Sequence, residues 1–162
     1  DFLVEEIFPR LAAAEGTARL VLVGPMPSPA MLAAAERDPR IVVTGAVPDV
    51  RPYLAEATAM AVPLFHGGGT HLKVLEAFAA RLPVISTRKG AAGLAVAHGV
   101  HLLLAADAEQ FVTSALSVWR DRALAQRLTT QARAVVEAEY SWAAAGARVR
   151  DAIGALDDGG QS

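Results

Sequence analysis

The sequence contains no cysteine, few aromatic residues and no long apolar run. Without cysteine, a disulfide framework and a thiolate metal site are both excluded, and the composition fits a reducing compartment. Aromatic residues form 6% of the chain against 53% hydrophobic residues in total, so the core must be built from Ala, Val and Leu. No apolar run approaches the roughly 18 residues that a membrane span needs.

The chain also lacks an excess of either charge. Its formal net charge of −2 at pH 7 supplies no global field for nucleic acid, and we expect no nucleic-acid partner. The scattered His66, His71, His98 and His101 match no metal-ligand spacing. We therefore expect neither a metal nor a cofactor, and any anion must be bound by a local site.

Short apolar strands alternate with helical segments along most of the chain. Strands are predicted at 18–24, 40–45, 58–65, 83–87 and 101–105, with helical segments at 1–16, 25–38, 46–57, 70–82, 107–121, 122–140 and 141–156. This alternation predicts an α/β fold, a Rossmann-like parallel sheet with helices on both faces. We expect one domain over residues 1–156 and a disordered tail at 157–162. Such sheets bind ligands beyond the carboxyl ends of their strands.

Three consecutive glycines follow the third predicted strand. Gly67, Gly68 and Gly69 precede a helix that is predicted to begin near Thr70. Glycine permits positive φ and lets a ligand approach the main chain, and a helix N-terminus attracts anions. A tight turn would need only one glycine, so the run favours a ligand site. Thr70 is equally suited to capping the helix and to contacting a ligand.

The helix after the glycines carries a polar stripe. Thr70, Lys73 and Glu76 are spaced three apart, so they share one face. Glu76 is the only acid between positions 57 and 106, a stretch whose Lys and Arg residues are Lys73, Arg81, Arg88 and Lys89. Such a carboxylate stays ionised and can accept hydrogen bonds from a ribose diol. The alternatives are a solvated face with a weak Lys–Glu pair, or an incidental surface glutamate.

These segments resemble part of a known enzyme family. The group 1 (family 4) glycosyltransferases, which have the GT-B fold, carry a donor-binding segment similar to GGGTHLKVLEAFAARLPVISTRKGAAGL. The likeness extends to VTGAVPDVRPYLAEA before it, and to HLLLAADAEQFVTSALSVWRD and AEYSWAAAG after it. The resemblance implies the nucleotide-sugar-binding, C-terminal domain of an enzyme of polysaccharide or lipid-linked glycan synthesis. It also implies retaining transfer to a glycan or lipid acceptor. The composition, rich in Ala, Arg, Gly and Val, indicates a bacterial source. Because the sequence shows no metal-ligand cluster, we expect a metal-independent site, and we expect a cytoplasmic or membrane-peripheral location.

The resemblance further implies roles for individual residues. Glu76 matches the second acid of the family's E-x7-E motif, which binds the ribose of the nucleotide. The loop of residues 67–70 and the start of its helix, with His71 and Lys73, would receive the diphosphate and lie near the donor sugar. Val47 would help to hold the base through its backbone.

The chain also departs from the family pattern. The first acid of E-x7-E should fall at position 68, which is Gly68, so no catalytic residue is assigned; backbone amides or His66 are the candidate substitutes. The family's upstream basic pair, its first strand and its acceptor domain have no counterpart in this sequence. We therefore expect a fragment that is inactive alone. The missing central strand should leave a gap that closes by rearrangement or pairs with another chain, for example in a homodimer through unpaired sheet edges.

Other functions fit the sequence less well. A nucleotide-sugar epimerase of similar architecture would need acid–base side chains, for which only the histidines are candidates. A non-catalytic nucleotide-binding module also stays open. A phosphorylation receiver is disfavoured because the predicted strands do not end in carboxylates. The sequence lacks the G-x-G-x-x-G of dinucleotide-binding dehydrogenases and the G-x-x-x-x-G-K-[ST] phosphate loop.

Overall fold

The computed structural model describes residues 1–66 and 72–140, and this part of the chain follows the predicted alternation of strands and helices. The elements are η1 (Leu3–Ile7), α1 (Phe8–Ala14), β1 (Leu20–Val23), α2 (Pro29–Arg37), β2 (Ile41–Gly45), α3 (Arg51–Glu56), β3 (Met60–Val62), α4 (Leu72–Ala79), β4 (Val84–Ser86), β5 (Leu103–Leu104), α5 (Ala108–Arg120) and α6 (Arg122–Glu139). The predicted α/β class is confirmed. The helix predicted at 141–156 and the tail at 157–162 lie outside the described residues.

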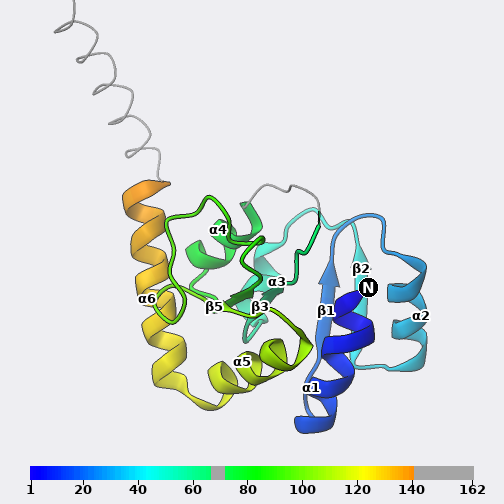
Figure 1. Cartoon of the computed structure of the whole chain (residues 1–162). Coiled ribbons are helices and arrows are strands. Elements are labelled where there is room, and N and C mark those ends of the chain that lie inside the picture. Colours follow the sequence, from blue (N-terminus) through cyan, green and yellow to red (C-terminus); the bar gives the residue numbers. More distant parts are fainter. Residues whose placement is uncertain (67–71, 141–162) are drawn as a thin grey trace, which may run out of the picture.

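The described strands form two parallel sheets instead of one (Figure 1). β1 pairs with β2, with Leu20 opposite Ile41, and β3, β4 and β5 form the second sheet in that order. The inner edges, on β1 and on β3, pair with no other strand of the described residues. The short β5 is an edge strand, as predicted.

The break between the sheets lies where we expected a missing central strand. Counted outward from the break, the strands run β1, β2 on one side and β3, β4, β5 on the other, as in a doubly wound sheet. The expectation that the sheet closes by rearrangement is wrong for the described residues. A helical segment packs against both halves. Pairing of these edges with another chain stays a prediction.

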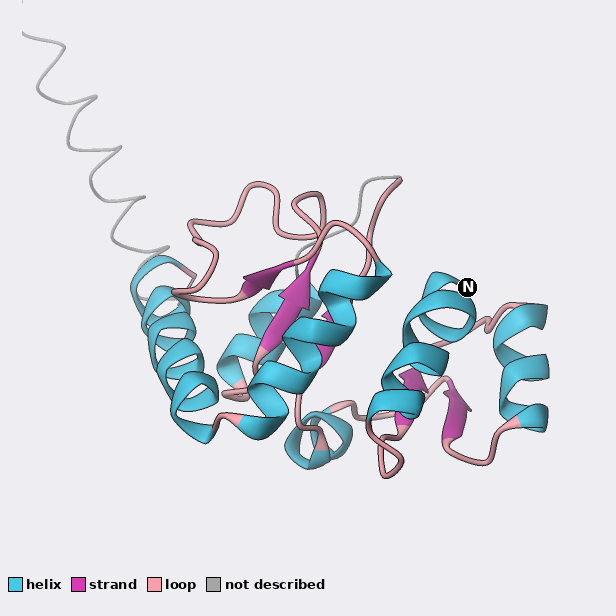
Figure 2. Cartoon of the chain, turned by 60° about the horizontal axis from the view of Figure 1, so that its bottom comes forward, coloured by secondary structure: helices cyan, strands magenta, loops and turns pink. Residues whose placement is uncertain are grey.

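That helical segment is η1 followed by α1. Val4 and Phe8 are buried against the β1–β2 half, in a cluster that includes Ile41. Ile7 is buried in a different cluster, with Phe111 of α5. In Figure 2 the segment, marked by the N label, lies between α2 and the rest of the molecule. Apolar residues on two sides of one helix therefore join the two halves of the fold.

Helices cover both faces of the β3–β4–β5 sheet. On one face Val84 packs in a cluster with Phe78 of α4 and Ala132 of α6. On the other face its neighbour Ile85 packs with Phe111 of α5. Successive side chains of a strand point to opposite faces, so the apolar run in β4 reflects burial on both sides. No helix in the described ranges is long and apolar enough to cross a membrane.

A buried polar cluster fixes the turn that follows β4 to the end of β3. The Ser86 hydroxyl donates to the Val62 carbonyl at 3.3 Å, and the Thr87 hydroxyl donates to the Leu64 carbonyl at 2.5 Å. The Thr87 hydroxyl also accepts the N–H of Gly90 at 3.0 Å. Gly90 is buried against the end of β3, where an added Cβ would overlap the Ser86 hydroxyl. Both strand ends are therefore held together.

Helix α4 ends in a Schellman motif. The N–H of Leu82 donates to the Ala77 carbonyl at 2.9 Å, and that of Arg81 to the Phe78 carbonyl at 3.0 Å. Arg81 has φ of 57°, a left-handed conformation usually taken by glycine at this position. The Arg133 guanidinium of α6 donates to the Ala79 carbonyl at 2.5 Å, so a cation also lies at the negative end of α4.

We predict that Gly90→Ala destabilises the fold. The added methyl group would overlap the Ser86 hydroxyl and lie 3.0 Å from the Val62 carbonyl oxygen. Overpacking of this kind costs about 1–3 kcal/mol, which urea unfolding would measure. Gly16→Ala is the control, because nothing lies within 4 Å of its added Cβ. Equal urea midpoints for the two variants would contradict the packing described.

We predict that Arg81→Gly stabilises the fold by about 1 kcal/mol, because glycine adopts positive φ without the steric cost of a Cβ. Arg81→Ala is the matched control, since alanine removes the long side chain but keeps the Cβ. Thermal and urea unfolding of both variants would check this. A gain shared by both variants would assign the effect to the arginine side chain and not to the backbone.

Candidate functional site

The predicted site residues divide into two groups in the structure. Gly67, Gly68, Gly69, Thr70 and His71 lie outside the described residues. Val47, His66, Lys73 and Glu76 lie within them. The described part of the site is therefore the exposed face of α4, together with the loops that follow β2 and β3.

Helix α4 separates a buried face from a polar one. Val74, Ala77 and Phe78 are fully buried in the cluster under the sheet, whereas Lys73 and Glu76 are exposed. The Glu76 carboxylate forms no hydrogen bond and no ion pair with a described residue. The weak Lys–Glu pair considered from the sequence is therefore not formed in the described structure. The core fixes the backbone of Glu76 while its carboxylate keeps its capacity to accept hydrogen bonds.

The loop after β2 is held by an acid, Asp49, to which the sequence pattern assigned no role. The Asp49 carboxylate accepts the Arg51 backbone N–H at 2.9 Å and pairs with the Arg51 guanidinium at 2.8 Å. These hydrogen bonds from the Arg51 side chain and backbone lower the pKa of Asp49. An aspartate two residues before its partner is typical of an Asx turn, and this spacing is the signal in the sequence that could have identified the Asp49–Arg51 pair.

Val47 lies in this loop, two residues before Asp49. Its side chain is half-buried, and its backbone N–H and C=O make no hydrogen bond to a described residue. Main-chain groups without partners at the carboxyl end of β2 are suited to a planar ligand that carries its own donors and acceptors. The expected use of the Val47 backbone is thus compatible with the structure.

His66 follows β3 and is exposed. It forms no hydrogen bond with a described residue. Its neighbour Phe65 contacts Phe2 of the N-terminal segment edge to face, with 5.0 Å between ring centroids. The described structure gives His66 no partner that would orient it as an acid or base.

The histidines before β5 have structural roles. His98 Nδ1 accepts the N–H of Leu104 at 2.9 Å, and His101 Nδ1 accepts the N–H of Ala97 at 2.9 Å. One ring nitrogen of each side chain is therefore committed to holding the loop that leads into the edge strand.

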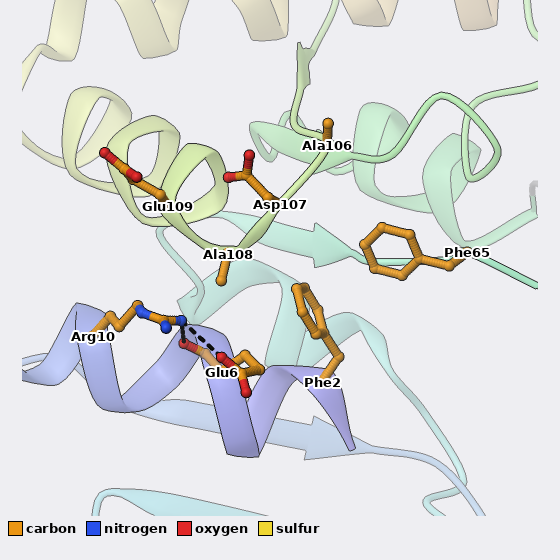
Figure 3. A pocket seen from close by; sticks show the side chains of 8 residues that line it. All are labelled: Phe2, Glu6, Arg10, Phe65, Ala106, Asp107, Ala108 and Glu109. Atoms are coloured by element: carbon orange, nitrogen blue, oxygen red, sulfur yellow. Dashed lines mark hydrogen bonds and ion pairs between the residues drawn. The ribbon is translucent and has the colours of Figure 1, made fainter.

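A cavity of about 440 Å³ lies between the N-terminal segment that forms η1 and α1, the N-terminus of α5 and the segment that follows β3. Figure 3 shows its lining, made of Phe2, Glu6, Arg10, Phe65, Ala106, Asp107, Ala108 and Glu109. Arg10 pairs with Glu6 at 2.8 Å, which leaves two further carboxylates on the rim without a second arginine. An acidic rim repels phosphate groups, and none of the predicted donor residues lines this cavity. The exposed face of α4 is therefore a better candidate for the predicted site than this cavity.

One family profile matches the chain. The sequence profile of the family described as Glycosyl transferases group 1 matches residues 1–121. No curated protein matches the chain.

Several solved structures share the fold. Anabaena HepE, crystallised in complex with UDP, superposes with a TM-score of 0.76 at 16% identity, over 95% of this chain and 44% of HepE. S. aureus TarM, in a complex that includes UDP, gives a TM-score of 0.73 at 16% identity, over 87% of this chain and 30% of TarM. The C-terminal domain of the group 1 glycosyl transferase LpcC from Francisella tularensis gives 0.61 at 14% identity, over 82% of this chain and 92% of that domain.

The chain thus spans less than half of HepE and of TarM, but nearly the whole of the solved LpcC domain. The resemblance to a C-terminal domain of a GT-B enzyme, expected from the sequence, is confirmed. The family profile covers well over half of the residues. This chain belongs to the group 1 glycosyl transferases.

Proposed function

We propose that the chain binds the nucleoside diphosphate of a nucleotide sugar and is the donor-binding part of a glycosyltransferase. The observation that carries the proposal is the Glu76 carboxylate, fixed on a core-packed helix and unpaired among the described residues. HepE was crystallised with UDP and with UDP-glucose, and TarM with UDP, which supports a nucleotide as the ligand class.

Each described site residue then has a role. Glu76 accepts hydrogen bonds from the ribose hydroxyls, because an ionised carboxylate is an acceptor only. Val47 holds the base through main-chain groups that have no hydrogen-bond partner among the described residues. Lys73, one helical turn before Glu76, contributes positive charge toward the diphosphate. The predicted contacts of residues 67–71 belong to the same proposal.

The proposed chemistry is retaining glycosyl transfer. The bond between the anomeric carbon and the diphosphate oxygen breaks, and a bond to an acceptor oxygen forms as the acceptor hydroxyl loses its proton. Donors that stabilise the departing diphosphate lower the barrier without a metal ion. We propose that the acceptor, a glycan or a lipid-linked glycan, is bound by parts of the protein outside this chain. The isolated chain then binds the donor without transferring its sugar.

The epimerase alternative is not favoured. Its acid and base would have to come from the histidines, and His98 and His101 each use one ring nitrogen to hold the loop before β5. His66 lies at the end of β3, where no described side chain orients it.

Calorimetric titration of UDP, GDP and ADP, with their sugars, tests the donor proposal. One nucleotide series should bind, and Glu76→Ala should weaken it about tenfold or more, equivalent to about 1.4 kcal/mol. Glu36→Ala on α2, also an exposed helical glutamate, is the control and should bind as the parent chain does. Affinities with and without a chelator should agree. Negligible heats for all nucleotides, or equal affinities for both variants, would exclude the proposed site.

We also propose that the inner edges of β1 and β3, which pair with no other strand of the described residues, pair with a second copy when the chain is isolated. Unpaired strand edges are templates for another strand. Sedimentation should show association that depends on concentration, and Val21→Lys on β1 should weaken it by placing a charge at the edge. Leu32→Lys on α2 is the control, because Leu32 and Val21 are exposed to similar extents, 47% and 46%. A monomer at every concentration would exclude this pairing.

A further inference from the structure

Two adjacent cations lie at the start of the turn that follows β4. Arg88 and Lys89 are both exposed, and neither forms an ion pair or a hydrogen bond through its side chain with a described residue. In the stretch of sequence from 57 to 106 the only acid is Glu76. Two neighbouring like charges thus lie at the carboxyl end of a strand without a described counter-ion.

The base of this turn is fixed although its cations are exposed. Thr87, immediately before Arg88, donates to the Leu64 carbonyl of the segment after β3, and accepts the N–H of Gly90. Gly90, immediately after Lys89, is buried against Val62 at the end of β3. The backbone on either side of the pair is therefore clamped to the strand that precedes α4.

That clamp decides where the charges lie. β3 and β4 are parallel neighbours, so their carboxyl ends meet at one edge of the sheet. The chain passes from this end of β3 toward α4, which carries Lys73 and Glu76. Arg88 and Lys89 consequently lie at the same edge as the proposed nucleotide site, at the end of the next strand.

We propose that Arg88 and Lys89 bind the phosphate groups of the nucleotide donor, an inference that rests on the function proposed above. A guanidinium matches two phosphate oxygens in one plane, and an ammonium adds a point charge that can follow the ligand. A preformed turn lowers the ordering cost of binding, because only the two side chains must be fixed. The ligand supplies the negative charge that the surrounding sequence lacks.

The cation pair and the other site residues would recognise different parts of the ligand. Glu76 and Val47 would address the nucleoside, which is uncharged, whereas Arg88 and Lys89 would address only the charged part of the ligand. Removal of the cations should therefore weaken binding of the diphosphate and leave the nucleoside unaffected. A merely solvated pair would affect neither.

The test compares a nucleoside diphosphate with its own nucleoside. Calorimetry on the chain and on the double variant Arg88→Gln/Lys89→Gln would use whichever of UDP, GDP and ADP binds, together with uridine, guanosine or adenosine. We expect the diphosphate affinity to fall about tenfold or more, as loss of two charge-assisted contacts implies. The nucleoside affinity should stay unchanged, and the diphosphate affinity should depend less steeply on salt.

The control is Arg122→Gln/Arg127→Gln, which removes two exposed cations from the first turns of α6, at the bottom of Figure 1. It should bind diphosphate and nucleoside as the parent chain does. An equal unfolding midpoint for the two double variants would show that Arg88→Gln/Lys89→Gln leaves the fold intact.

The outcomes separate this inference from the proposed function. If the parent chain binds the diphosphate and Glu76→Ala weakens it, but Arg88→Gln/Lys89→Gln keeps the ratio of diphosphate to nucleoside affinity, only the present inference is wrong. If the control variant loses as much affinity, the effect is one of net charge, and the inference is wrong again. If the parent chain binds no nucleoside diphosphate, both proposals fail.

Discussion

The fold of this chain depends on one helical segment that buries apolar side chains on two sides. Val4 and Phe8 of η1–α1 belong to the core of the β1–β2 half, and Ile7 belongs to the core that α5 shares with β4. The two sheets are not hydrogen-bonded to each other in the described structure, so their relative placement rests on this packing. Buried side chains here hold the two halves together, as a continuous hydrogen-bond ladder does in an unbroken sheet.

A second constraint acts at the edge that carries the candidate site. Ser86 and Thr87 use their hydroxyls to hold the ends of β3 and β4 together, and Gly90 lets the next turn pack closely against them. Buried hydroxyls must find partners, and here they use the carbonyls of Val62, the last residue of β3, and of Leu64, which follows the strand. The polar cluster thus fixes the ends of β3 and β4 relative to each other, and with them the start of the segment that follows each strand.

The sequence predicted the order and type of the described elements because their periodicities are strong and their boundaries carry Gly, Pro or Asp. It also placed Lys73 and Glu76 on one polar stripe of the helix, because they are spaced three residues apart. In the structure both are exposed, and Val74, Ala77 and Phe78 form the buried face. The sequence predicted a gap in the sheet but left open whether the gap closes, because closure depends on tertiary packing that periodicity does not encode. Nor did it assign Asp49 to Arg51 or Thr87 to Leu64, because such pairs follow from loop geometry that periodicity does not encode.

Glu76 has no charged partner among the described residues, unlike some other surface carboxylates. Asp38 and Asp49 form ion pairs with Arg40 and Arg51 of the same loops. The hydrogen bonds in these pairs lower the pKa of both carboxyl groups. Glu76, by contrast, lies on a rigid base and makes no pair with a described residue. Exposed groups of this kind cost little while they are solvated, yet their fixed backbones reduce what binding must order. This edge presents a carboxylate, main-chain groups and cations that are unpaired among the described residues. It is therefore suited to a ligand that combines hydroxyls, a base and phosphates.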